Sequence, residues 1–285
     1  MGYLLRRHRI PKAVRPGVCD TLFRCVEWYG FHKLWERSRL EVYEFGQGFR
    51  KIVWNGKTII IPKVFSVKRL ISIIVELDVA INAHYFFHRK FDVAEGRWII
   101  DVGACEGLFA ILCHERWPGA MVMAIEPSPT MSSALGQTVV ENRCSDKVQI
   151  IQCLLGATEG EALFEENLAD LASSRVVSLE NGQGLPGVRV AVRTIDKVCI
   201  ESGRIAGAIK MDAEGAELEI LKGAEQTLRR DRPILMITTY HNRDDAFNIA
   251  GWLRGLGVGY NIEVRGITSL NESAPRPVML FAFGK

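Results

Sequence analysis

A glycine turn that contains acidic side chains is the stretch of this sequence whose residue types and spacing most clearly favour ligand binding. Gly103 and Gly107 flank Glu106 in a G-x-x-x-G pattern, and Asp101 precedes the turn. Glu126 follows nineteen positions after Gly107. An acidic residue at about that spacing accepts hydrogen bonds from both ribose hydroxyls in nucleotide-binding α/β folds. The pattern therefore predicts a nucleoside site in which Glu126 binds the ribose.

The charge of the turn distinguishes between two classes of nucleotide. Dinucleotide sites use a G-x-G-x-x-G turn to hold a pyrophosphate, and a carboxylate such as Glu106 would repel that group. S-adenosylmethionine carries no phosphate, and its sulfonium and ammonium groups are compatible with Asp101 and Glu106. The sequence therefore favours a methyl donor over NAD. We expect the backbone of Gly103, Ala104 and Gly107 to face the methionine end of S-adenosylmethionine.

A second acidic cluster is formed by Asp212, Glu214 and Glu217, and His241 comes at the end of the next apolar run. The carboxyl ends of parallel strands are where open α/β sheets bind ligands. If the acceptor of a methyl group is an alcohol, it is a poor nucleophile unless its proton leaves during attack, which calls for a base within hydrogen-bond reach. Asp212, Glu214 and His241 are therefore candidate catalytic residues that orient or deprotonate the acceptor, and Glu217 is expected in the first turn of a helix. The same trio would suit magnesium, but we assign no metal.

Strands and helices alternate along the second part of the chain. Short apolar runs predict strands at residues 98–102, 121–125, 148–154, 205–211, 234–239, 258–264 and 278–283. Helices are expected to begin near Leu108, Ser128, Thr194, Ala216 and Asp244. The last two strands are expected to pair antiparallel. This order predicts an α/β, Rossmann-like seven-stranded sheet over residues 96–285, with Leu155 lining the adenine at the end of the third strand.

Residues 1–95 are expected to form a separate extension. It should contain a basic arm, a helix over residues 21–40, a β-hairpin turned at Asn55-Gly56 and a long helix over residues 66–88. At the end of that helix, His84 and Tyr85 either pack at the seam between the two parts, the favoured interpretation, or line a substrate pocket. Residues 156–193 are long, polar and rich in glycine, so an irregular region with hairpin character is expected to close over a substrate.

The composition limits the classes of function. Among 285 residues, 48% are hydrophobic and 24% are charged, which is typical of a globular protein, and a net charge of +3 does not favour nucleic acid as a partner. Seven cysteines without C-x-x-C pairs argue against a disulfide framework or a zinc site and favour the cytoplasm. We expect no signal peptide and no transmembrane segment. Contact of the basic arm with an anionic membrane is a minority interpretation, and the oligomeric state stays open.

Several motifs together resemble those of FkbM-type methyltransferases. They are Asp101-Val-Gly-Ala-Cys-Glu-Gly, Ala124-Ile-Glu-Pro, Ser173-Ser174 and Ile209-Lys-Met-Asp-Ala-Glu-Gly-Ala-Glu. The resemblance covers residues 97–241 and implies a class I methyltransferase fold that uses S-adenosylmethionine. Assigned members of this family are usually O-methyltransferases, so the resemblance implies methylation of a hydroxyl on a small molecule, sugar or lipid-like product.

Two residues depart from the pattern of that family. Cys105 stands where the family usually has Asn, and Thr239 stands where an acidic residue often precedes the histidine. These departures leave open a catalytically silent methyltransferase-fold scaffold as one alternative. A methyltransferase that modifies carbon or nitrogen is another.

Overall fold

The computed structural model describes residues 40–78, 85, 92–167, 174–178, 187–268 and 276–284. The predicted basic arm, nearly all of the predicted helix over residues 21–40, His84 and Ser173 lie outside these residues. Within the described part of the chain, no helix combines the length and the apolar character that a membrane span requires.

A seven-stranded sheet forms the centre of the molecule. Its strands are β4 (Trp98–Val102), β5 (Met121–Ile125), β6 (Val148–Ile151), β11 (Ala206–Met211), β12 (Ile234–Thr238), β13 (Asn261–Thr268) and β14 (Arg276–Phe283). Their spatial order is β13-β14-β12-β11-β4-β5-β6. The strands β12, β11, β4, β5 and β6 run parallel to one another, β14 is antiparallel to β12, and β13 and β14 close the sheet as the predicted antiparallel pair. The chain reverses its direction of winding between β4 and β11, so the topological switch point lies between these two strands.

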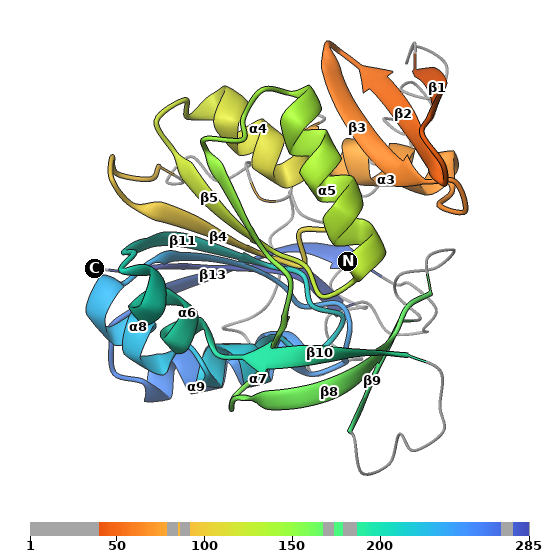
Figure 1. Ribbon diagram of the computed structural model, residues 1–285. Helices are drawn as coiled ribbons and strands as arrows, with labels where there is room; N and C mark the ends of the chain where they lie inside the picture. Colours follow the sequence, from red (N-terminus) through yellow and green to blue (C-terminus); the bar gives the residue numbers. More distant parts are fainter. Residues whose placement is uncertain are drawn as a thin grey trace, which may run out of the picture.

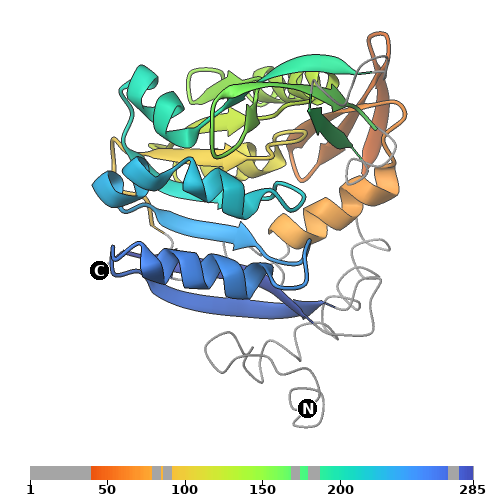
Figure 2. The ribbon, with the colours of Figure 1, turned by 90° about the horizontal axis from the view of Figure 1, so that it is seen from below.

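Helices cover both faces of this sheet (Figure 1). On one face lie α4 (Leu108–Arg116) and α5 (Pro129–Glu141), and on the other lie α6 (Ile195–Ser202), α7 (Glu217–Lys222), α8 (Glu225–Asp231) and α9 (Asp245–Gly255). Successive residues of β4 point to opposite faces, so Ile99 packs in one hydrophobic cluster with Leu108, and Ile100 packs in a second with Leu221. Figure 2 shows α9 lying along the β13–β14 edge. The predicted class I methyltransferase architecture is thus confirmed.

We expected one continuous helix from Ala216 to beyond Leu228. This prediction is wrong in one respect, because the helix divides into α7 and α8 at Gly223. The carbonyl of Gly223 accepts a hydrogen bond from the backbone of Asp196. A Cβ at Gly223 would overlap the backbone oxygen of Gly156. This close approach to two other segments interrupts the helix, and no local sequence period reveals it.

The N-terminal region carries its own three-stranded sheet, made of β1 (Glu41–Phe45), β2 (Phe49–Trp54) and β3 (Lys57–Pro62). The turn between β2 and β3 has φ of 48° at Asn55 and 75° at Gly56, which confirms the predicted type I′ hairpin. The helix α3 (Val67–Asp78) confirms the described part of the predicted long helix.

This sheet packs on α5. The backbone N–H of Ile60 donates to the Thr138 hydroxyl at 2.9 Å, and that of Thr58 donates to the Asn142 side chain at 3.0 Å. Ile59 belongs to the same hydrophobic cluster as the helices on that face of the main sheet. The predicted division into domains at residue 95 stays a prediction.

A third sheet, of four strands, contains the described part of residues 156–193; its antiparallel pairs confirm the predicted hairpin character, but the region is more regular than we expected. The sheet consists of β7 (Leu154–Leu155), β8 (Gly160–Glu165), β9 (Arg175–Ser178) and β10 (Val188–Arg193), in the order β7-β10-β8-β9. The predicted strand over residues 148–154 was too long, because β6 ends at Ile151 and Leu154 already pairs with β10. The valines at alternate positions of β10 explain why this region is β structure.

Candidate functional site

The two predicted clusters meet at the topological switch point. The backbone N–H of Asp212 donates to the Val102 carbonyl at 3.1 Å, so the end of β11 is tied to the end of β4. Gly103 has a φ of 72°, and a Cβ there would overlap the backbone oxygen of Asp212. The glycine turn and the acidic loop therefore lie in direct backbone contact.

Glycine is required at two positions of the turn. Besides Gly103, Gly107 has a φ of 86° at the start of α4, and a Cβ there would overlap the Leu135 side chain on α5. The backbone of Cys105 also lies in the left-handed region, with φ of 51°. Asn adopts that conformation more readily than Cys, which gives a conformational reason for the Asn that FkbM-type sequences usually carry there. The predicted residues Gly103, Ala104 and Gly107 all lie in this turn.

Glu126 lies against the same turn. Its Oε2 accepts a hydrogen bond from the Cys105 N–H at 2.9 Å, and its Oε1 accepts one from the Ser128 N–H at 2.9 Å. Burial raises the pKa of Glu126 to about 7, although these two hydrogen bonds oppose the shift. The carboxylate predicted to bind the ribose is thus held rigidly at the turn, in a position fixed by two backbone donors.

Lys210 is a buried charged residue at this site that the sequence analysis did not single out. Its Nζ lies 2.9 Å from Asp101 Oδ1 and donates to the carbonyls of Val102 at 3.2 Å and Gly103 at 2.7 Å. Burial alone would lower the pKa of Lys210, but the charges of Asp101 and Asp212 outweigh it and raise the pKa. The signal was present in the sequence, because Lys210 is a charged residue inside the otherwise apolar strand β11. Its ammonium group organises the glycine turn through the two carbonyls.

Glu106 provides a test of whether S-adenosylmethionine fits this turn. Its carboxylate is buried, and Oε2 has no hydrogen-bond partner among the described residues. Burial raises the pKa of Glu106. A buried carboxylate oxygen without a donor suits a cationic ligand and opposes a phosphate. The turn therefore fits S-adenosylmethionine, and Leu155 lies in the hydrophobic cluster that contains Ile125 at the end of β5.

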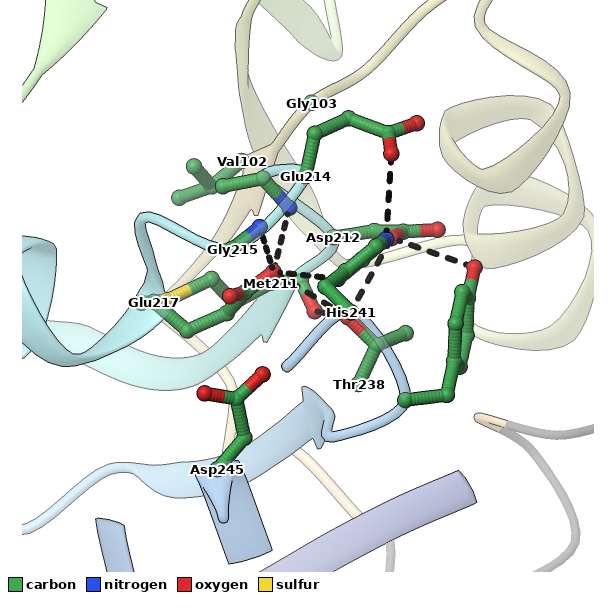
Figure 3. A network of polar contacts seen from close by, with 12 residues as sticks. Val102, Gly103, Met211, Asp212, Glu214, Gly215, Glu217, Thr238, His241 and Asp245 are labelled. Carbon is green, nitrogen blue, oxygen red and sulfur yellow. Dashed lines mark hydrogen bonds and ion pairs between the residues drawn. The ribbon is translucent and has the colours of Figure 1, made fainter. Parts of the chain in front are cut away.

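The three candidate catalytic residues come together around one imidazole (Figure 3). His241 Nε2 lies 3.4 Å from Asp212 Oδ1 and 3.2 Å from Glu214 Oε2. His241 Nδ1 lies 3.0 Å from Glu217 Oε1. Glu217 stands in the first turn of α7 as expected, but it also belongs to this network, a role that the sequence did not predict.

Glu217 is locked in place by the loop between β11 and α7. Its Oε1 accepts hydrogen bonds from the backbone N–H of Ala213 at 2.9 Å and of Gly215 at 3.3 Å. The loop can make both bonds because Gly215 has φ of 97° and Glu214 has φ of 51°. The buried carboxylate of Glu217 is therefore held in one position. The side chains of Asp212 and Glu214 are 31% and 44% exposed and can contact a ligand.

Three hydroxyl groups from two segments of the chain reach Asp212. They belong to Tyr85 at 3.3 Å, Thr238 at 3.2 Å and Tyr240 at 3.4 Å. Tyr85 also packs edge-on against Phe109, so it combines the packing role that we favoured with a place at the site. Sequence reasoning missed Thr238 and Tyr240, whose only signal was their position at the end of the strand before His241.

The charge state of His241 follows from its neighbours. Burial alone would lower the pKa of this imidazole. Hydrogen bonds with Glu214 and Glu217 and the charge of Asp212 outweigh burial and raise the pKa to about 10. The pKa of Glu217 is lowered, because the hydrogen bond from His241 outweighs burial. At neutral pH the ligand-free site therefore holds an imidazolium among three carboxylate groups.

Comparisons with known proteins agree with this geometry. Residues 101–261 match the family described as Methyltransferase FkbM domain. The chain is 26% identical to Methyltransferase sdnD of Sordaria araneosa, over 50% of this chain and 66% of that protein. It is 26% identical to 31-O-demethyl-FK506 methyltransferase FkbM of Streptomyces tacrolimicus, over 60% and 76%. It is 29% identical to Hexuronic acid methyltransferase AglP of Haloferax volcanii, over 45% and 50%.

One solved structure supports the fold. Methyltransferase FkbM from Methylobacillus flagellatus KT superposes with a TM-score of 0.53 at 16% sequence identity, over 90% of this chain and 59% of that chain. The chain thus spans less than two-thirds of the length of the sdnD protein and of this solved chain. The family match extends over more than half of the chain and includes both clusters of the site. The chain therefore belongs to the FkbM methyltransferase domain family, whose cofactor is S-adenosylmethionine.

Proposed function

We propose that this protein methylates a hydroxyl oxygen of a small molecule, a sugar or a lipid-like product. The observation that carries the proposal is the convergence of Asp212, Glu214 and His241 at the switch point, in backbone contact with the glycine turn. Two of these side chains are partly exposed, so an acceptor can reach them. The arrangement combines a donor site with groups that accept a proton.

S-adenosylmethionine, when bound, supplies an electrophilic methyl group. In our proposal the backbone of Gly103, Ala104 and Gly107 holds its methionine end, Glu126 accepts hydrogen bonds from the ribose, and Leu155 lines the adenine. Glu106 would balance positive charge from the buried oxygen that has no donor among the described residues. Asp101 acts through its ion pair with Lys210, which sets the position of the turn.

In our proposal Asp212, Glu214 and His241 have different roles toward the acceptor. A hydroxyl is a poor nucleophile until its proton is taken, and a carboxylate within hydrogen-bond reach can take it during attack. The carboxylates of Asp212 and Glu214 are the exposed members, so we assign proton acceptance to one of them. The imidazolium of His241 holds both side chains in one orientation. Fixed orientation of the acceptor oxygen contributes a further part of the rate.

The names of two relatives support an oxygen-bearing acceptor. One is a methyltransferase of 31-O-demethyl-FK506, and the other is a methyltransferase of hexuronic acid. The sequence also favours a small molecule over nucleic acid, because the net charge is only +3. We further propose that the protein acts in the cytoplasm, since all five cysteines in the described part of the chain are free thiols.

The direct test uses S-adenosylmethionine labelled with deuterium in its methyl group. The protein is incubated with panels of hydroxylated macrolides, sugars and lipids, and products are identified by mass spectrometry. We expect a labelled methyl ether on one class of acceptor. Label on a carbon or nitrogen atom of the product would show that the acceptor atom is not oxygen. Saturable cofactor binding without any labelled product would instead support the silent scaffold.

A further inference from the structure

We propose that Asp212, Glu217 and His241 hold a divalent cation. The metal site is argued from the side chains themselves, and its role in the reaction rests on the proposed function. The sequence alone left such a cation open as an alternative, and the structure adds a compact set of ligand atoms.

The spacing of the ligand atoms fits one ion. One carboxylate oxygen of Asp212, one of Glu217 and one imidazole nitrogen of His241 lie within 4.8 Å of one another. Atoms bound to the same octahedral Mg²⁺ are separated by about 3 Å when adjacent and about 4 Å when opposite, and calcium allows slightly longer separations. The three side chains can therefore bind one cation with only small adjustments of their rotamers.

The acidic groups near His241 outnumber the basic ones, because the charge of Lys210 reaches Asp212 but is shared with Asp101. Glu217 is completely buried, and its Oε2 has no hydrogen-bond partner within the described segments. Two further carboxylates, Asp212 and Glu214, approach the same imidazole. Asp245 adds a fourth acidic group, and burial and the charge of Glu217 raise its pKa. Buried carboxylates are normally paired or coordinate a metal. One proton on His241 offsets a single charge, whereas a divalent cation offsets two.

The chemistry of the ligands narrows the class of cation. Two carboxylates and one imidazole suit a hard or borderline divalent ion, and Mn²⁺ accepts both oxygen and nitrogen ligands. The loop that carries Glu217 is fixed by two backbone hydrogen bonds, so this ligand is positioned before any ion binds. A cation at this place would replace the imidazole proton, because a metal ligand must be deprotonated.

The cation would act on the acceptor hydroxyl. A divalent ion that binds a hydroxyl oxygen lowers the pKa of that group. The carboxylate of Glu214 would accept the released proton, since it is the most exposed acidic group of the network and does not belong to the ligand set. No electron is gained or lost, so the step needs no further reactant.

The test measures Mn²⁺ binding directly by electron paramagnetic resonance, in which bound Mn²⁺ loses the sharp signal of the free ion. The purified protein is first treated with EDTA, dialysed and titrated with Mn²⁺ alone. We expect one site per chain. Binding should weaken by about tenfold or more in Asp212→Asn and in His241→Asn, the loss typical of altered metal sites. Circular dichroism and thermal unfolding check that each variant is folded.

The matched control is Glu219→Gln. This carboxylate lies on the same short helix as Glu217, but it is 56% exposed and pairs with Lys222. Its removal should leave Mn²⁺ affinity unchanged. The proposal is overturned if the wild-type protein leaves the signal of free Mn²⁺ unaltered, or if folded Asp212→Asn binds Mn²⁺ as tightly as the wild type.

The outcome also separates this inference from the proposed function. Methyl ether formation at an undiminished rate after EDTA treatment, without Mn²⁺ binding, overturns the cation and leaves the function intact. Mn²⁺ binding by the wild type, lost in Asp212→Asn but without any methyl ether product, supports the cation and overturns the function.

Discussion

The glycine turn after β4 and the acidic loop after β11 lie against each other, yet they are stabilised in different ways. The turn depends on backbone conformation, since Gly103 and Gly107 have positive φ and leave no room for a Cβ. The loop depends on side-chain charge, since Asp212, Glu214 and Glu217 converge on His241. The comparison teaches that the glycine turn, our proposed donor side, is defined mainly by shape, whereas the acidic loop, our proposed acceptor side, is defined by charge. Substitutions in the two regions should therefore differ in their effects on turnover, donor affinity and stability.

Asp212→Asn should produce the largest effect. Turnover should fall by about 10²- to 10⁴-fold, the range for disruption of a proton-transfer site, because Asp212 either takes the proton or positions the acceptor beside Glu214. Affinity for S-adenosylhomocysteine should stay close to the wild-type value, because Asp101 still pairs with Lys210, which holds the glycine turn. Steady-state kinetics and calorimetry measure the two quantities. A large loss of affinity for S-adenosylhomocysteine with little loss of turnover would mean that Asp212 binds the methyl donor.

Gly103→Ala should damage both regions together. The added Cβ would overlap the backbone oxygen of Asp212 in a residue whose φ is 72°. We expect the free energy of unfolding to fall by about 3 kcal/mol, as measured by urea denaturation.

Gly119→Ala is the matched control for this substitution. A Cβ at Gly119 would meet no atom within 4 Å, so the free energy of unfolding should change by less than about 0.5 kcal/mol. Equal stability of the two variants would mean that the turn and the loop are not packed as described.

Glu126→Ala should affect only the donor side. Loss of hydrogen bonds to an ionised group costs about 1.5–3 kcal/mol, so affinity for S-adenosylhomocysteine should fall by about 10- to 100-fold. The variant should remain folded. Asp146→Ala removes a carboxylate that is 75% exposed and should not change the affinity. If both variants bind as the wild type does, Glu126 does not contact the ribose.

The pH dependence of donor binding should be the smallest of these effects. The pKa of Glu126 is raised by burial to about 7, and the ionised carboxylate is the stronger acceptor for ribose hydroxyls. Affinity for S-adenosylhomocysteine should therefore rise by about tenfold between pH 6 and pH 8, and Glu126→Gln should remove this rise.

The effect of the same group on stability has the opposite sign. The folded protein binds this proton more tightly than the unfolded chain does. The contribution of Glu126 to the free energy of unfolding is therefore lost as pH rises from 4.5 to about 7. If affinity for S-adenosylhomocysteine falls with rising pH, the assignment of Glu126 to the ribose is contradicted.

The same comparison explains which features could be predicted from the sequence. The donor turn was predictable because positive φ and close packing demand glycine at Gly103 and Gly107, and local sequence records that demand. The parallel strands were predictable because each is an uninterrupted apolar run. The separate four-stranded sheet was not, since β7 leaves the main sheet only through its pairing with β10, far along the chain.

The acceptor side was predictable only in part. Asp212, Glu214 and His241 were found because they follow strands at a known edge of the sheet. The hydroxyls of Tyr85 and Thr238 reach Asp212 from separate segments, so no local pattern contains them. The role of Lys210 depends on carbonyl groups of the neighbouring strand, and those contacts exist only in the folded sheet.

Calorimetric titration of the purified protein with S-adenosylhomocysteine, beside a parallel titration with NADH, tests the central claim most directly. The account predicts one saturable site for S-adenosylhomocysteine and no saturable heat with NADH, because Glu106 excludes a pyrophosphate from the turn. Saturation by NADH, or no saturable heat with S-adenosylhomocysteine, would contradict a site built for a phosphate-free nucleoside.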